Sequence, residues 1–215
     1  MNKMKIILRT EAPADHKRVE EITREAFWNV NCPGCNEHWL VHVLRDSPDF
    51  IPDLDLVAEL DGEVVGNIMY ARSLIRTSRG SEHPVLTFGP VSVLPAFQNM
   101  GIGQTLIKTT LKMAKEAGHG AVLIYGDPDY YQRFGFTAAE VFGIRTKGGS
   151  FSPALQSMEL EPGYLKGIEG CFEEAAVYDV DPAAAEEFDY AFQPREKLVT
   201  ESQKRFLDLL SQSHE

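Results

Sequence analysis

The segment from Val91 to Gly103 constrains the fold most, because an apolar strand passes there through a glycine-punctuated turn into a long amphipathic helix. Apolar residues recur after the turn at helical spacing until Gly118. They form two rows: Ile102, Leu106, Thr110, Met113 and Ala117, and Ile107, Leu111 and Ala114. We therefore predict a helix that begins near Gly101. The first N–H groups of a helix lack intrahelical partners, so this start favours anionic oxygens.

The two glycines of the turn suit a diphosphate. Gly101 and Gly103 have no Cβ, so a ligand can approach the backbone closely, and Gln98 adds an amide donor. The alternative is that the glycines only shape a tight turn. A Walker A loop is excluded because Gln104 follows Gly103 where a lysine is needed. A dinucleotide-binding turn is excluded because Leu106 occupies the place of its third glycine.

A second motif, Tyr130-Tyr131-Gln132-Arg133-Phe134-Gly135-Phe136, lies downstream of a predicted strand at 121–125. Asp127 is suited to cap a short helix, and Pro128 to occupy its first position. The aromatic motif is therefore expected on a short, locally specified helix.

Together the two motifs resemble the GNAT acetyltransferase superfamily, and the later part of the chain is similar to its YhbS-like bacterial subgroup. The resemblance implies an α/β (α+β) fold, with a mixed, largely antiparallel sheet flanked by helices on both faces. It implies acetyl-CoA as cosubstrate, with the pantetheine arm along the backbone of Ser92 and Val93. The diphosphate would then lie on the loop residues Gln98, Asn99, Met100, Gly101, Ile102 and Gly103.

The same resemblance gives Tyr131 the role of general acid, which protonates the departing thiolate. The alternative is that both tyrosines are packing aromatics with hydrated hydroxyls. No motif assigns the base. Glu37 is our first choice for a base or an amine contact and Glu82 a distant second, while both are equally read as solvated surface charges.

The remaining pattern fits one GNAT domain over residues 1–150, with a C-terminal extension over 151–215 that packs on the same domain. We predict a first strand at 5–9, a helix that ends near Phe27, and a hairpin about Asp61-Gly62 between strands at 54–60 and 63–75. The extension is predicted to hold a strand at 155–160, a second within 168–180, a helix or connector at 182–187 and a helix at 200–210. Such an extension would complete the acceptor pocket or a homodimer contact.

Composition sets broad limits on location and partners. An apolar content of 43% is ample for a core. No run of about 18 apolar residues and no signal-peptide core occurs, so we expect no membrane partner and a cytoplasmic location. The net charge of −11 argues against nucleic acid as a partner and permits an amine. Three cysteines do not suggest a disulfide scaffold.

Cys32-Pro33-Gly34-Cys35, followed by His38 and His42, has donor types that could bind zinc. The histidines follow the cysteines too closely for a typical zinc motif, and the turn can instead open the helix that bears Trp39. We therefore expect no metal at this segment.

These observations predict an N-acetyltransferase that moves an acetyl group from acetyl-CoA to a primary amine by direct attack in a ternary complex. The acceptor would be a small molecule or a protein amino group. The alternative is a non-catalytic acyl-CoA-binding sensor or regulatory protein, which would share the loop. The sequence leaves open the acceptor, the acyl-chain range and the oligomeric state.

Overall fold

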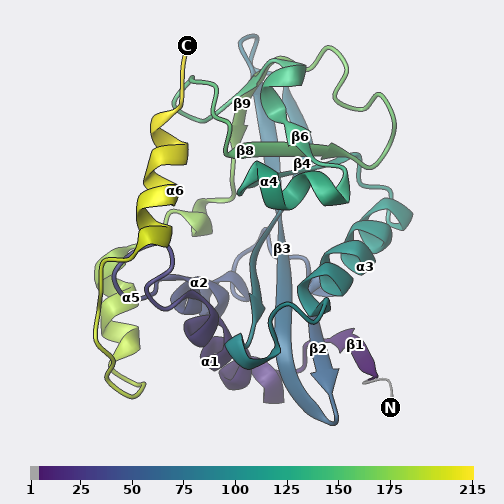
Figure 1. The fold of residues 1–215 in the computed structure, drawn as a ribbon. Coiled ribbons are helices and arrows are strands. Elements are labelled where there is room, and N and C mark those ends of the chain that lie inside the picture. The colour runs from purple at the N-terminus through teal and green to yellow at the C-terminus, as the bar shows by residue number, and fades with distance from the viewer. Residues whose placement is uncertain (1–4) are drawn as a thin grey trace. The chain divides into compact units, whose positions relative to one another are not determined.

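The computed structural model, drawn as a ribbon in Figure 1, describes residues 5–215 apart from the side chain of Phe206. The chain divides into two compact units. Unit 1 comprises the chain up to Tyr70, Gly89–Thr110 and Ala176–Gln203. Unit 2 comprises Ala71–Phe88, Leu111–Ala175 and Lys204–Glu215. Residues beyond 150 thus contribute to both units, and the domain division at residue 150 stays a prediction.

The strands of unit 1 are β1 (Ile6–Thr10), β2 (Leu56–Leu60), the first part of β3 (Glu63–Thr77) and the last part of β4 (Glu82–Val93). The rest of β3 and of β4 belongs to unit 2. β2 pairs antiparallel with both β1 and β3. Asp61 and Gly62 join β2 to β3 with φ angles of 52° and 85°. Two successive left-handed residues characterise a two-residue hairpin turn, which confirms the predicted hairpin.

The helices of unit 1 are α1 (His16–Phe27), α2 (Glu37–Leu44), α5 (Pro182–Asp189) and the first part of α3 (Ile102–Glu116). The described residues of this unit also form four short 3₁₀ helices: η1 (Pro13–Asp15), η2 (Pro52–Leu54), η3 (Pro95–Phe97) and η6 (Ala176–Tyr178). α1 packs on α2, and α5 lies beside α2 (Figure 1). α5 forms a helix because Asp181 caps it, accepting a hydrogen bond from Ala183 N at 2.9 Å.

In unit 2 β5 (Ala121–Tyr125) runs parallel to β4, with Leu86 opposite Val122. β8 (Leu155–Glu159) pairs antiparallel with β5 and with β6 (Thr137–Ala138). β9 (Gly170–Glu173) pairs antiparallel with β3, and β7 (Ile144–Arg145) lies parallel to β9. The sheet is mixed and mostly antiparallel, as predicted. The strand expected within 168–180 covers only the four residues of β9, because the chain turns into η6 (Ala176–Tyr178).

The helices of unit 2 are α4 (Pro128–Tyr131), the rest of α3 and most of α6 (Glu201–Ser211). The 3₁₀ helices η4 (Gln132–Phe134) and η5 (Ala139–Phe142) complete it. One buried cluster forms its core: Ile75, Val85, Ala121, Leu123, Ala139, Ile144, Leu155, Leu165 and Phe172. The end of the chain joins this unit through Phe151 and His214, whose backbones exchange hydrogen bonds of 2.8 and 3.0 Å.

Within residues 5–215, no helix has the length and apolar character that crossing a membrane requires.

Candidate active site

The predicted diphosphate loop leads from the end of β4 through η3 to the start of α3, and Gly89–Thr110, which contains it, belongs to unit 1. Asn99 and Gly101 have φ angles of 60° and 82°. Asparagine tolerates this left-handed region better than most residues, and glycine enters it without strain. The chain therefore reverses sharply before Ile102, where the helix begins.

The start of α3 leaves backbone donors without helical partners. The first helical hydrogen bond runs from Thr105 N to Gly101 O at 2.9 Å, and the Thr105 hydroxyl donates to the same oxygen at 2.9 Å. The N–H groups of Ile102, Gly103 and Gln104 precede that bond, so helix geometry provides them with no acceptor. These donors and the helix dipole favour an anion at this point.

Close packing fixes the loop on the sheet of unit 1. A Cβ at Gly66 of β3 would lie 2.9 Å from the backbone oxygen of Ser92 and 3.3 Å from the Ile102 side chain. Only glycine therefore allows the start of α3 to approach β3 so closely. The buried Ser92 side chain is used by the fold, since its hydroxyl lies 2.9 Å from the Thr23 hydroxyl.

The side chain of Gln98 has a role inside the turn. Its Nε2 atom donates to Val93 O at 3.1 Å, and the side chain is exposed. The amide donor expected for a ligand is therefore partly used to hold the end of β4 against the loop. Among the described residues, the N–H groups at the helix start have no protein partner and stay available to a ligand.

Tyr131 lies at the end of α4 in unit 2. Asp127 caps this helix by accepting a hydrogen bond from Asp129 N at 2.9 Å, and Pro128 occupies its first position, both as predicted. A Cβ at Gly126 would overlap the Tyr131 ring. The sequence analysis assigned nothing to Gly126, although a glycine directly before a helix cap is a signal of close approach.

The Tyr131 ring packs in an aromatic cluster whose other members are Phe88, Tyr130, Phe134 and Phe136, with centroids 5.0–6.2 Å away. Among residues 5–215 its hydroxyl has no hydrogen-bond partner. Burial raises the pKa of this hydroxyl well above its usual value, and neighbouring Tyr130 adds to the rise. The phenol therefore stays protonated at neutral pH and has a free hydrogen to donate.

Glu37 opens α2 in unit 1, and its carboxylate turns back onto the preceding loop. Oε1 accepts from Asn31 Nδ2 at 2.6 Å, while Oε2 accepts from Asn36 N at 3.1 Å and from the Cys35 thiol at 3.4 Å. The side chain thus holds the loop closed, which is a structural role. Its role as base or amine contact stays a prediction.

Glu82, the second choice for a base, is exposed in unit 2. It forms an ion pair with Arg76 at 2.6 Å.

The two histidines that follow Cys32 and Cys35, His38 and His42, contact different residues. His38 is fully buried, with its ring centroid 5.4 Å from that of Phe188 and its Nε2 atom 3.1 Å from Asp189 Oδ1. His42 Nδ1 lies 2.8 Å from Glu20 Oε1. In the part of the chain that is described, no three His, Cys, Asp or Glu residues are grouped as metal ligands.

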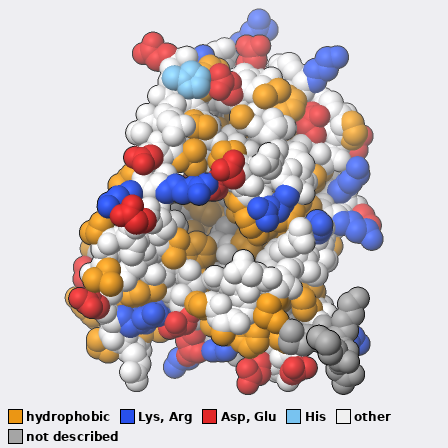
Figure 2. Space-filling view, viewed as in Figure 1, with side chains coloured by type: hydrophobic (Ala, Val, Ile, Leu, Met, Phe, Trp, Pro, Cys, Tyr) orange, Lys and Arg blue, Asp and Glu red, His pale blue; other side chains and the backbone are white. Residues whose placement is uncertain are grey.

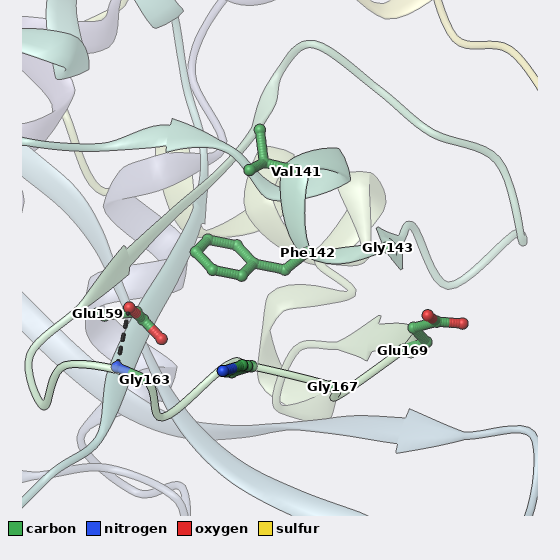
Figure 3. Close-up of a pocket in the computed structure, with 8 residues that line it drawn as sticks. Val141, Phe142, Gly143, Glu159, Gly163, Gly167 and Glu169 are labelled. Atoms are coloured by element: carbon green, nitrogen blue, oxygen red, sulfur yellow. Dashed lines mark hydrogen bonds between the residues drawn. The ribbon is translucent and has the colours of Figure 1, made fainter.

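Two cavities lie away from the motif residues. A cavity of about 450 Å³ in unit 2 is drawn in Figure 3, where Phe142 extends between Glu159 and Glu169. Glu159 is engaged there, since it accepts hydrogen bonds from Gly163 N at 3.2 Å and Leu165 N at 2.7 Å. A cavity of about 330 Å³ in unit 1 is lined by Trp28, Cys32, Pro33, Cys35, Asn36, Pro182, Glu186, Asp189 and Lys197.

Charges of both signs are interspersed on the face drawn in Figure 2. No extended basic field of the kind that binds nucleic acid occurs on that face.

Comparison with known proteins identifies related chains. A family model described as an acetyltransferase (GNAT) domain matches residues 53–138. The uncharacterized N-acetyltransferase YhbS of Escherichia coli strain K12 is 28% identical over 169 residues, which cover 78% of this chain and 95% of that protein.

Solved structures give the same result. The structure of the GNAT family N-acetyltransferase YhbS from Escherichia coli, in complex with CoA, matches with a TM-score of 0.72 and 25% identity. The match covers 83% of this chain and 94% of that one. A GNAT family acetyltransferase from Brucella melitensis, in complex with acetyl-CoA, matches with a TM-score of 0.67 and 32% identity, over 82% of this chain and 100% of that one.

Proposed function

The chain belongs to the GNAT acetyltransferase family, and we propose that it transfers the acetyl group of acetyl-CoA to a primary amine. The start of α3 carries this proposal, because it combines unpaired N–H groups with a glycine turn at the position of the family motif. The relatives solved with CoA and acetyl-CoA support the choice of cosubstrate.

The loop would hold the cosubstrate through its backbone. The N–H groups of Ile102, Gly103 and Gln104 would bind the diphosphate oxygens, stabilised by the dipole of α3. The backbone of Ser92 and Val93 would pair with the pantetheine arm, and an N–H there would polarise the acetyl carbonyl. The Ser92 hydroxyl bonds to Thr23, which leaves only its backbone for this task.

Tyr131 would act on the leaving group. As the amine nitrogen bonds to the acetyl carbon, the carbon–sulfur bond breaks and the thiolate takes a proton from the Tyr131 hydroxyl. The phenolate is then reprotonated by the proton lost from the nitrogen, directly or through water. A positioned proton donor contributes roughly 10²–10⁴-fold to such a step.

Thiol release from acetyl-CoA, measured across a panel of primary amines, tests the proposal. The matched variant is Gly101→Trp, which places a large side chain at a residue with φ of 82°. We expect amine-dependent release by the parent chain, with acetyl-CoA binding and release both lost in the variant while its thermal unfolding stays cooperative. Coenzyme binding by the parent chain without turnover on any amine would indicate a sensor instead.

A further inference from the structure

Glu174 follows β9 directly, and its partly exposed carboxylate has no assigned role. Among residues 5–215 neither of its oxygens has a hydrogen-bond or ion-pair partner. The adjacent Glu173 differs, since both of its oxygens accept hydrogen bonds from Arg76 at 2.8 and 3.2 Å. One of two successive glutamates is therefore paired by the fold, and the other is partly buried without a partner among the described residues.

The pairing of β9 with β3 sets the face on which Glu174 lies. Phe172 stands opposite Ile75, and both belong to the buried core of unit 2. Alternate residues of a strand share a face, so Glu174 continues on the face of Phe172, away from Glu173. The register of the two strands ends at the pair of Leu74 with Glu173, and its continuation by one residue would bring Ser73 opposite Glu174. The buried Ser73 hydroxyl also has no partner among the described residues.

The end of β5 lies beside this carboxylate. The Tyr125 ring centroid is 6.1 Å from that of Phe172, and burial, followed by the charge of Glu174, raises the pKa of Tyr125 to about 12. The next residue, Gly126, is the one covered by the Tyr131 ring. Tyr131 therefore lies against the residue that follows Tyr125, at the same end of β5.

Burial also gives the Glu174 carboxylate a pKa of about 7. Glu174 and Cys171 of β9 both act on Tyr125 of β5, while the cations Arg76 and Lys147 act on Glu173 and lower its pKa. Among the described residues, no cation offsets the effect of burial on the pKa of Glu174. A group that titrates near neutral pH is suited to accept a proton at that pH.

We propose that Glu174 is the general base that takes a proton from the acceptor amine, with the Ser73 hydroxyl as a second polar contact on the acceptor side. The proposal rests on the proposed function. The ammonium form R–NH₃⁺ transfers one proton to the Glu174 carboxylate, and the resulting neutral amine attacks the acetyl carbon. Glu174 then releases its proton to solvent. Sulfur leaves as the thiol, protonated by Tyr131, and the phenolate regains the second proton that the nitrogen loses as the amide forms.

The pH profile of kcat/KM tests this assignment. The variants are Glu174→Gln and, as matched control, Glu173→Gln, whose side chain faces Arg76. We expect the parent rate to rise through about pH 7 and then level off. Glu174→Gln should lower the rate at pH 7 by roughly 10²–10⁴-fold. Its remaining rate should keep rising with pH up to the pKa of the amine itself, while Glu173→Gln keeps the parent profile.

Three outcomes would overturn the assignment or its premise, and they are distinguishable. If Glu174→Gln keeps the parent rate and profile, Glu174 is not the base. If it lowers the rate equally at every pH, with the parent profile retained, its role is structural. If the parent chain binds acetyl-CoA but releases no thiol with any amine, the proposed function itself fails. Thermal unfolding and acetyl-CoA binding of each variant separate these results from misfolding.

Discussion

The Tyr131 ring lies against Gly126, so that any Cβ at Gly126 would occupy the space of the ring. This contact joins the last residues of β5 to α4 over a very short connection. It fixes the direction of the Tyr131 side chain more firmly than the short helix alone, because four residues of helix carry little stability of their own.

We expect Gly126→Ala to displace Tyr131. The added methyl group should cost about 1–3 kcal/mol in the free energy of unfolding, as overpacking does. The turnover number should fall by a larger factor than the affinity for acetyl-CoA. Urea unfolding and steady-state kinetics measure both effects, with Gly148→Ala as control because its Cβ would meet only the Thr146 hydroxyl at 3.7 Å. Equal stability and turnover in Gly126→Ala and the parent chain would contradict the prediction.

Tyr131→Phe should remove catalysis and leave the fold intact. The hydroxyl makes no hydrogen bond within the described chain, so its loss should change the free energy of unfolding little. We expect kcat to fall by roughly 10²–10⁴-fold and the acetyl-CoA dissociation constant to stay unchanged. Tyr130→Phe is the control, since Tyr130 is exposed and its ring lies under Arg133 at 4.6 Å. A full rate in Tyr131→Phe would exclude this tyrosine as the proton donor.

Stability should fall in mild acid through His38. Burial lowers the pKa of His38 from 6.5 to about 4, so between these values the unfolded chain binds the extra proton. The contribution of His38 is therefore complete above pH 6.5 and is lost as pH falls towards 4, at up to about 1.4 kcal/mol per pH unit. Urea unfolding from pH 4.5 to 7.5 should show a shallower pH dependence in His38→Phe. If the free energy of unfolding depends equally on pH in both proteins, His38 is not the cause of the loss of stability in acid.

Glu174 should act on stability in the opposite direction. Its pKa rises from 4.5 to about 7 in the folded chain, so the folded chain binds the extra proton between these values. The contribution of Glu174 to the free energy of unfolding is therefore present at low pH and is lost as pH rises towards 7. We therefore expect Glu174→Gln to be more stable than the parent chain at pH 8 and close to it at pH 4. If the variant and the parent chain are equally stable at pH 8, burial of the Glu174 charge does not lower the free energy of unfolding, and the prediction is wrong.

Local signals in the sequence predicted most of the fold and part of the candidate site. The hairpin at Asp61-Gly62, the start of α3 and the cap at Asp127 each depend on residues adjacent in the chain, and all three are confirmed. Glu174 has no such signal. Its environment comes from the pairing of β9 with β3 and from the approach of Tyr125, which are distant in sequence.

Glu37, in contrast, is selected from the sequence, but the sequence cannot decide its role. A glutamate at a helix start reads equally as an exposed charge, a base or a cap. Only the contacts with Asn31, Cys35 and Asn36 reveal that its carboxylate closes the loop before α2. Side-chain direction decides between these roles, and the residue type alone does not.

Mass spectrometry of the amine product tests the central claim most directly. Isotopically labelled acetyl-CoA is incubated with an amine from the panel and with either the parent chain or Tyr131→Phe. We predict that the parent chain forms an amide carrying the labelled acetyl group, one for each thiol released, and that Tyr131→Phe forms it far more slowly. Release of thiol and free acetate without labelled amide would contradict the account, because the chain would then hydrolyse the thioester and acetylate no amine.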